Sequence, residues 1–166
     1  SLGADLTING TLALTGGALD IGIRTLTFQN GNTPITRTTG TLTLSSFSTL
    51  IFGTAGNTGG AAFSIPAGTY SGPTLGGLRV NRDNSLTICA AYLTLTTLYL
   101  TKGLINNAAY LRMASGSTIY ASGGTLSYLP TYIPLANFNI VYCNNSSEIT
   151  CGYEIPSGCR VINLTV

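Results

Sequence analysis

The chain has 166 residues, which suits one domain or a stack of small repeated units. Seven basic and five acidic residues, scattered singly, give a net charge of +2 and form no basic stripe of the kind that follows a nucleic-acid backbone. The sequence contains no histidine, which excludes triads of the Ser-His-Asp type and argues against Cys/His zinc sites, leaving only an all-cysteine site formally open.

Hydrophobic residues make up 44% of the chain and charged residues only 7%. This hydrophobic content is too high for a disordered chain, so we expect a packed core beneath a surface of hydroxyl and amide groups. No window approaches the roughly 18 apolar residues that a membrane-spanning helix requires. The first residues, Ser1 to Ala4, lack the charged start of a signal peptide. We therefore expect no membrane span.

Short runs that alternate apolar residues with Thr, Ala or Gly begin at the N-terminus, and this is the periodicity of β-strands. The first runs are Leu6–Ile8, Leu12–Leu14, Leu19–Ile23, Leu26–Phe28 and Leu42–Leu44. Turn dipeptides such as Asn9-Gly10, Gly16-Gly17, Asn30-Gly31 and Gly59-Gly60 separate the runs. Apolar residues do not recur at helical spacing with capping signals around them. The chain is therefore predicted to be all-β.

Phrases from one part of the chain recur in another. Leu12-Ala-Leu-Thr-Gly-Gly resembles Leu98-Tyr-Leu-Thr-Lys-Gly, and Phe63-Ser-Ile-Pro-Ala-Gly resembles Tyr153-Glu-Ile-Pro-Ser-Gly. The Ile-Pro phrase is followed in its first copy by Leu86-Thr-Ile. In its second copy the phrase lies near the C-terminus, and the matching continuation, Leu6-Thr-Ile, opens the chain. The end of the sequence thus leads into its beginning.

This order divides the chain into two related sub-repeats of one unit. The first sub-repeat covers residues 63–152, and the second covers residues 153–166 and continues into residues 1–62 of the next unit. We expect either tandem copies or separate subunits whose last strand docks beside the first strand of a neighbour. The alternative is a self-contained domain whose ends merely look alike.

Short strands and glycine turns, repeated without crossover helices, predict a β-solenoid of the parallel β-helix type. Six to eight coils of about 20 to 30 residues, each rising about 4.8 Å, would give a length of roughly 30 to 40 Å. The alternative is an antiparallel β-sandwich or an incomplete barrel completed by a neighbour's strand. The strands expected to join units contain Leu6, Ile8, Ile162, Leu164 and Val166.

The candidates for disulfide bonds are the four cysteines, Cys89, Cys143, Cys151 and Cys159. They form no C-x-x-C motif, and three of them are spaced eight residues apart, which favours disulfides in an oxidising, extracellular setting. Four cysteines allow three pairings, and the sequence does not choose among them. We favour Cys143 with Cys151, which would close the loop 144–150.

Five carboxylates are the only candidates for acid-base chemistry. Asp83, beside Arg79 and Arg82, is the only local cluster, and a role in the turn 81–84 fits it better than catalysis. The turns carry Asn, Ser and Thr in place of the dense Asp of calcium-binding β-rolls. We therefore predict that the chain is not an enzyme and binds no metal or other cofactor.

Tyrosines and sequons are candidates for contact with glycans. Tyr92, Tyr99, Tyr110 and Tyr120 fall in successive predicted strands, where we favour ordinary half-buried packing; the alternative is an exposed sugar-binding ladder. Asn9, Asn144, Asn145 and Asn163 begin Asn-x-Ser/Thr triplets and are possible glycan-attachment sites.

Four longer phrases carry a family resemblance: Thr41 to Gly53, Gly59 to Thr69, Leu78 to Thr87, and Gly152 to Gly158. They resemble repeats of very large secreted surface proteins of Bacteroidetes-type bacteria, which serve as adhesins or cell-surface filaments and are exported by the type IX route. The resemblance covers nearly the whole chain and carries over no catalytic residue. The cysteines depart from the usual repeat and suggest covalent reinforcement.

The composition, the repeats and the resemblance together lead to one expectation about function. We expect a structural subunit or tandem repeat of an extracellular filament or surface fibre, a homopolymer joined end to end by strand pairing. The alternative is an adhesin segment that binds glycans at the cell surface.

Overall fold

The computed structural model describes residues 1–29, 32–56, 59–72, 74–89, 91–132, 137–143, 152–155 and 160–166. The protein is 55% strand and 2% helix, and its coils wind into a β-solenoid of about seven turns. Every strand pair in these ranges is parallel. The predicted β-solenoid is therefore confirmed, and the antiparallel alternative is not the fold.

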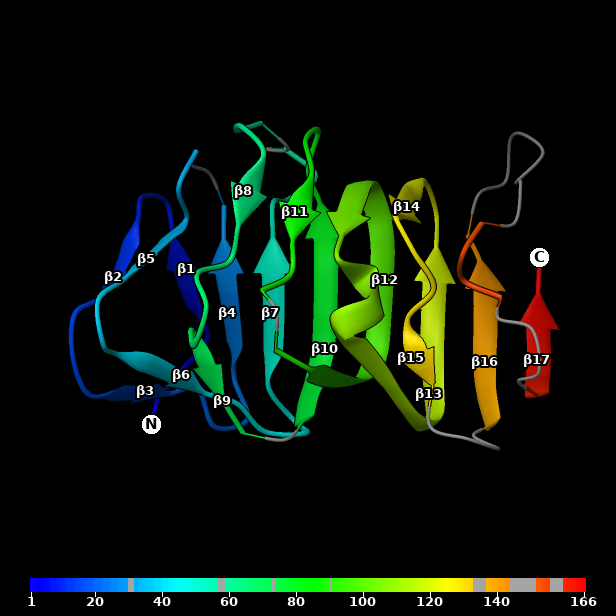
Figure 1. The fold of residues 1–166 in the computed structure, drawn as a ribbon, viewed down its shortest axis with the longest axis horizontal. Coiled ribbons are helices and arrows are strands. Elements are labelled where there is room, and N and C mark those ends of the chain that lie inside the picture. The colour runs from blue at the N-terminus through cyan, green and yellow to red at the C-terminus, as the bar shows by residue number, and fades with distance from the viewer. Residues whose placement is uncertain are drawn as a thin grey trace.

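One parallel sheet runs along the whole molecule, with one strand from each coil (Figure 1). We call it the main sheet. Its strands follow the order β1 (Leu6–Ile8), β4 (Thr25–Phe28), β7 (Thr49–Phe52), β10 (Thr74–Asn81), β12 (Leu93–Asn106), β13 (Leu111–Ala121), β16 (Asn137–Tyr142) and β17 (Arg160–Thr165). The first and last of these strands lie at opposite ends of the long axis.

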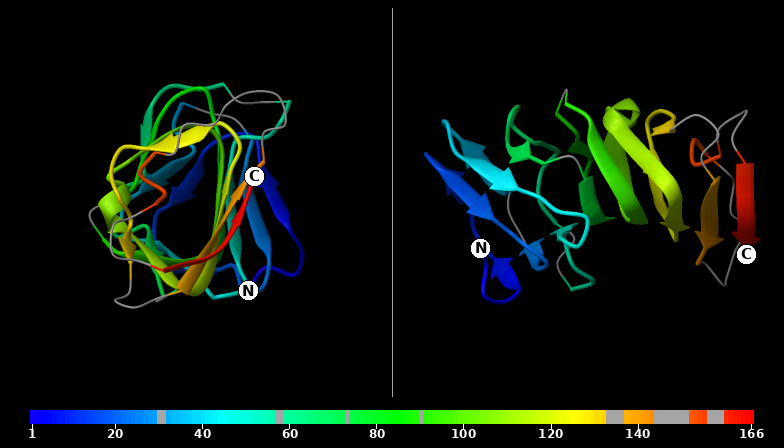
Figure 2. Two further views of the ribbon diagram at one scale, coloured as in Figure 1. Left: turned by 90° about the vertical axis from the view of Figure 1, so that its right-hand side faces the viewer. Right: turned by 90° about the horizontal axis from the view of Figure 1, so that it is seen from below.

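Shorter strands form the other sides of the coils. They are β2 (Leu12–Leu14) with β5 (Ile35–Arg37); β3 (Ala18–Asp20) with β6 (Thr41–Thr43) and β9 (Tyr70–Ser71); β8 (Phe63–Ser64) with β11 (Leu86–Thr87), the end of β12 and β14 (Gly124–Leu126); and β15 (Thr131–Tyr132), which pairs with β13. A single 3₁₀ turn, η1, spans Ala108–Tyr110. Viewed along the axis, the coils enclose a common interior (Figure 2).

The register of the main sheet stacks like residues on like residues. One inward column consists of Leu6, Leu26, Leu50, Leu78, Leu98, Ile119, Ile140 and Leu164. Successive members are 20, 24, 28, 20, 21, 21 and 24 residues apart, which confirms the expected coil length. Because side chains alternate across a strand, the residues on either side of this column point outward.

The coil is the structural repeat of this solenoid. Leu12 and Leu98 occupy equivalent places in the two similar phrases, but Leu12 lies in β2 and Leu98 lies in the main-sheet part of β12. Similarity of these phrases therefore does not mean the same position within a coil. The division into sub-repeats 63–152 and 153–166 with 1–62 stays a prediction.

Two glycines allow the chain to turn where coils approach closely. Gly53 follows β7 with a φ of 82°, and a Cβ atom there would lie 2.0 Å from the carbonyl oxygen of Asn81. Gly103 lies within β12 with a φ of 86°, and its Cβ would lie 2.3 Å from the carbonyl oxygen of Arg82. Only glycine combines this backbone conformation with so little space. At Gly103, β12 leaves the main sheet and begins to pair with β14.

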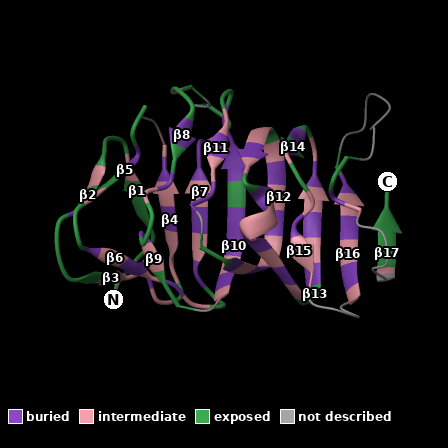
Figure 3. Ribbon diagram, in the orientation of Figure 1, coloured by how far each residue is buried: buried purple, intermediate pink, exposed green. Residues whose placement is uncertain are grey.

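The core consists of one large cluster of buried aliphatic and aromatic side chains and, toward the C-terminal end, a second cluster of Ala121, Phe138, Ile140 and Tyr142. Phe28 and Phe52 stack at 5.0 Å between ring centroids, and both are buried. Burial is strongest in the middle coils, whereas β17 is largely exposed (Figure 3). Within the described ranges, no helix is long and apolar enough to cross a membrane.

Candidate functional sites at the solenoid ends and on the main sheet

The inward Leu/Ile column is uncovered at both ends of the solenoid. Its six middle members are at most 1% exposed, whereas Leu164 in β17 is 56% exposed and Leu6 in β1 is 37% exposed. The cause is geometric, because each end strand has a neighbouring coil on one side only. The same residues that complete the core elsewhere therefore form apolar edges here.

The other predicted joining residues also lie on these two edges. Val166 is 91% exposed and follows directly on β17, and Ile8 is half-buried in β1. Ile162 is 50% exposed and has no partner in the register of β16 and β17, because Val161 pairs with Phe138 and Asn163 pairs with Asn139. Ile162 is thus the extra residue of a β-bulge.

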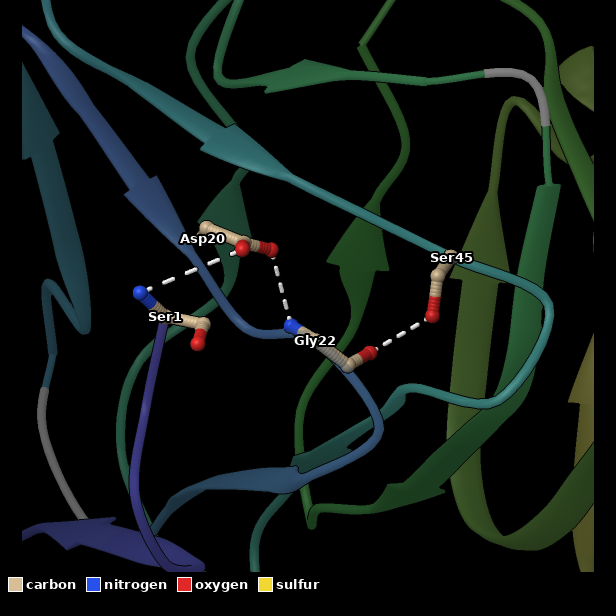
Figure 4. A network of polar contacts seen from close by, with 4 residues as sticks. All are labelled: Ser1, Asp20, Gly22 and Ser45. Carbon is tan, nitrogen blue, oxygen red and sulfur yellow. Dashed lines mark hydrogen bonds and ion pairs between the residues drawn. The ribbon is translucent and has the colours of Figure 1, made fainter.

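A chain of polar contacts holds the N-terminal end in order (Figure 4). The Asp20 carboxylate accepts a hydrogen bond from the backbone N–H of Gly22 at 2.9 Å and lies 3.9 Å from the N-terminal ammonium of Ser1. The carbonyl oxygen of Gly22 accepts a hydrogen bond from the Ser45 hydroxyl at 2.5 Å. The backbone N–H of Leu2 also donates to the carbonyl of Asp20, at 2.9 Å. These contacts link three successive coils at one corner.

The outer face of the main sheet carries a stack of three side chains. The Arg79 guanidinium lies 4.5 Å from the centre of the Tyr99 ring, and the Tyr99 and Tyr120 rings stack at 4.9 Å with planes 7° apart. The register explains the stack, because Arg79 pairs with Tyr99 between β10 and β12, and Tyr99 pairs with Tyr120 between β12 and β13. Both faces of the Tyr99 ring are therefore occupied.

A groove of about 380 Å³ lies beside this stack, which we call the Arg79 groove. It crosses the outer face of the main sheet from β1 to β12. Its lining residues are Thr7, Thr27, Gln29, Ile51, Gly53, Thr54, Ala55, Arg79, Asn81 and Thr101. Six of these ten residues carry a hydroxyl or amide group alongside methyl and methylene groups, and Arg79 is the one charged residue in this lining.

The four tyrosines form two separate pairs, and Tyr99, Tyr110 and Tyr120 are half-buried, as we favoured. Tyr99 and Tyr120 form one pair on the main sheet, whereas Tyr92 and Tyr110 form a separate tilted pair, 5.8 Å apart, just before β12 and in η1. The Arg112 guanidinium lies 4.4 Å from the centre of the Tyr92 ring. Because Tyr92 and Tyr99 lie in one coil and Tyr110 and Tyr120 in the next, the four rings do not share one outward column. Closed on both faces, Tyr99 is not a stacking platform for a sugar ring.

The sequence suggested a charged cluster of Asp83, Arg79 and Arg82, but in the structure each of the three side chains has a different environment. Asp83 forms an ion pair with Lys102, Arg79 lies on the outer sheet face, and Arg82 is 1% exposed. An Arg82 guanidinium nitrogen donates to the carbonyl of Ala61 at 2.8 Å, and burial lowers the pKa of Arg82. The three side chains do not converge on one cleft.

Two further carboxylates accept hydrogen bonds from the backbone. Asp5 accepts a hydrogen bond from the backbone N–H of Thr25 at 2.9 Å, and the buried Glu154 accepts one from Gly152 at 2.7 Å. Glu148 lies outside the described residues. Within the described ranges, no three His, Cys, Asp or Glu side chains gather as metal ligands would.

No disulfide is seen among the described cysteines. Cys143 is exposed at the end of β16 with a free thiol, and Cys151, the partner that we favoured for it, lies outside the described residues. Cys89 is also free, but its thiol is buried in the core and donates to the hydroxyl of Tyr70 at 3.1 Å. Burial raises the pKa of Tyr70, and the Cys89 thiol adds to the shift. Cys151 and Cys159 lie outside the described residues.

The candidate glycan-attachment sites differ in accessibility. Asn9 is exposed in the turn after β1. Asn163 is exposed in β17, but its side-chain nitrogen donates to the side-chain oxygen of Asn139 at 2.8 Å. Asn144 and Asn145 lie outside the described part of the chain.

The sequence did not indicate that Arg79 stacks on Tyr99 and lines a groove, because it was interpreted there as a solvated charge near Asp83. Its outward direction can be read from the alternation in Leu78-Arg79-Val80. Its place over Tyr99 cannot, because it depends on the length of the coil between them.

No family model, curated protein or solved structure matches the chain. The fold alone therefore defines its class, that of the β-solenoid proteins.

Proposed function

We propose that the chain is a structural unit of an extracellular bacterial filament or surface fibre, in which copies join end to end through β17 and β1. The uncovered inward column carries this proposal. Leu164 and Leu6 lie at the two uncovered ends of the inward column, whose middle members are fully buried. Unpaired strand edges template further pairing, and an assembly that uses them as its joint keeps them from uncontrolled aggregation.

The sequences of the two edges suit one register. β17 and the residue after it end in Leu164-Thr165-Val166, and β1 reads Leu6-Thr7-Ile8. Pairing Leu164 with Leu6 continues the inward column, sets the two threonines side by side on the outer face, and brings Val166 to Ile8. A slip of one residue would set an aliphatic side chain against a polar one in every pair, which disfavours other registers.

A cell-surface location and the absence of catalysis belong to the same proposal. The surface is covered by Thr, Ser and Asn, and only 7% of residues are charged. Of the two candidate glycan-attachment sites that the structure describes, Asn9 is favoured. A glycan on Asn163 would displace the hydrogen bond to Asn139. Of the described carboxylates, Asp83 binds Lys102 and Glu154 is buried, so these two do not suit acid-base catalysis of hydrolysis.

Self-association measured by sedimentation tests the joint. We expect the chain to form linear oligomers as its concentration rises and Leu164→Lys to remain monomeric, because a lysine would bury its charge in the joint. The matched control is Phe47→Lys, which alters an even more exposed apolar residue (74% exposed) in the turn before β7, away from both ends. A chain that stays monomeric at every concentration, or equal loss of association in both variants, would contradict the proposal.

The second candidate function is adhesion through glycans, and the observation that favours it is the Arg79 groove. The groove reaches Thr7 in β1, but it lies on the outer face of the sheet and not on the strand edge that would pair with β17, so both functions can coexist in one fibre.

A further inference from the structure

We infer that the Arg79 groove binds a carboxylated polysaccharide, with the carboxylate of one sugar held by Arg79. The inference concerns the outer face of the main sheet and is independent of end-to-end joining. Three properties of the groove support it: a guanidinium with free donors, a lining of hydroxyl and amide groups, and a spacing set by the coils.

The first property is the state of Arg79. Its side chain is exposed and stacked on Tyr99, and among the described residues it forms no hydrogen bond or ion pair. Stacking holds a guanidinium by its face and leaves the N–H groups at its edge available. Those N–H groups form a planar fork that matches a carboxylate with two parallel hydrogen bonds. Arg79 is thus already oriented before a ligand arrives.

The charge around the groove favours an anion at this position. The nearest acid along the chain, Asp83, is paired with Lys102. Asp5 precedes β1 and contacts Thr25, so it lies at the opposite end of the groove, three strands of the main sheet from Arg79. A carboxylate at Arg79 therefore meets an unopposed positive charge.

The second property is the polar lining. Thr27, Gln29, Thr54, Asn81 and Thr101 supply both donors and acceptors, as sugar hydroxyl groups require. The wall is not an aromatic platform, because Tyr99 has Arg79 on one face and Tyr120 on the other. Recognition here must come from hydrogen bonds and charge, which favours an acidic sugar over a neutral one that stacks on aromatic rings.

The third property is the axial spacing. Neighbouring strands of a sheet lie about 4.8 Å apart, which is comparable with the length of one hexose ring. A polysaccharide that crosses the strands would therefore meet one row of outward side chains per sugar. Arg79 is the one cation in this lining, whereas binding along a nucleic-acid backbone uses several. An acidic sugar polymer, whose hydroxyl groups the polar side chains of the lining can bind, fits the groove better than a nucleic acid.

Titration calorimetry with oligogalacturonate tests the inference, and its fully methyl-esterified form serves as the matched neutral ligand. We expect the acid to bind and the ester to bind at least about tenfold more weakly, because hydrogen bonds to a charged partner are the strong ones. Arg79→Gln should lose about tenfold or more in affinity for the acid. Arg79→Lys should lose less, since it keeps the charge but not the fork.

Arg112→Gln is the matched control, because Arg112 stacks on Tyr92 as Arg79 does on Tyr99 but lies outside the groove. We expect it to bind like the unchanged chain. Equal loss in both arginine variants, equal binding of acid and ester, or equally tight binding of single-stranded DNA would overturn the inference. Unfolding midpoints of the variants exclude a folding defect. Repeating the titration with Leu164→Lys separates this inference from the joint, since the groove should bind even where joining fails.

Discussion

The side-chain amide of Asn163 donates a hydrogen bond of 2.8 Å to the side-chain oxygen of Asn139, one coil earlier in the main sheet. Asn139 in turn lies 3.4 Å from the hydroxyl of Thr118, to which its nitrogen donates. Three outward residues on successive coils are thus connected along the axis, and similar amide ladders reinforce stacked strands generally.

This ladder predicts a measurable contribution to stability. Asn139→Ala removes both hydrogen bonds and should lower the free energy of unfolding by about 1 kcal/mol, because the groups are partly exposed and water replaces each bond in part. Urea unfolding measures the change. Thr125→Ala, at an exposed position of β14, is the control and should change stability by less than about 0.5 kcal/mol. Equal effects would show that the amide contacts contribute nothing.

Gly53→Ala should destabilise the protein by at least about 2 kcal/mol, because the new Cβ would collide with the Asn81 carbonyl in a backbone conformation that alanine disfavours. Gly56→Ala provides the comparison, since a Cβ at Gly56 meets nothing within 4 Å. Thermal unfolding of the two variants should give a large decrease in melting temperature for the first and little change for the second. If Gly53→Ala left the melting temperature unchanged, the close approach of Gly53 to the Asn81 carbonyl would be contradicted.

Within the inward column, the free energy of unfolding that is lost when a leucine is truncated to alanine should depend on its position along the axis. Leu98→Ala leaves a cavity between two coils and should cost about 2 to 5 kcal/mol. Leu164→Ala, at the exposed end of the same column, should cost less than about 1 kcal/mol when measured at low protein concentration. Denaturant unfolding of both variants makes the comparison. Similar losses at the two positions would contradict the open C-terminal edge.

The raised pKa of Tyr70 predicts a stability that depends on alkaline pH. Above pH about 10 an unfolded tyrosine loses its proton while Tyr70 keeps it, so the folded state binds more protons and stability falls as the pH rises. Tyr70→Phe removes this dependence.

The Tyr70→Phe variant should be less stable than the unchanged chain at pH 7, because it loses the hydrogen bonds of Tyr70 to Ala91 and Cys89. The difference should narrow between pH 10 and 11. Urea unfolding at each pH measures it. A constant difference across this range would show that Tyr70 ionises as freely in the folded protein as in the unfolded chain.

The local pattern of the sequence determined the all-β class, the approximate range of coil lengths and the alternation that turns residues such as Leu26 and Leu98 inward. These properties follow from the two-residue alternation of a strand and from glycine turns, which act over a few neighbouring residues. The sequence also pointed to Leu6 and Leu164 as members of edge strands.

Only the tertiary structure decided which residues meet across coils. Arg79 lies over Tyr99 because the coil that separates them is twenty residues long. A coil longer by one residue would shift the contact. The same dependence separates Asp83 from Arg79 and buries Cys89 against Tyr70. Coil lengths between 20 and 28 residues are set by turns whose shape depends on packing against the coils before and after them. Contacts between coils are therefore a property of the stacked solenoid, and the alternation within one strand does not contain them.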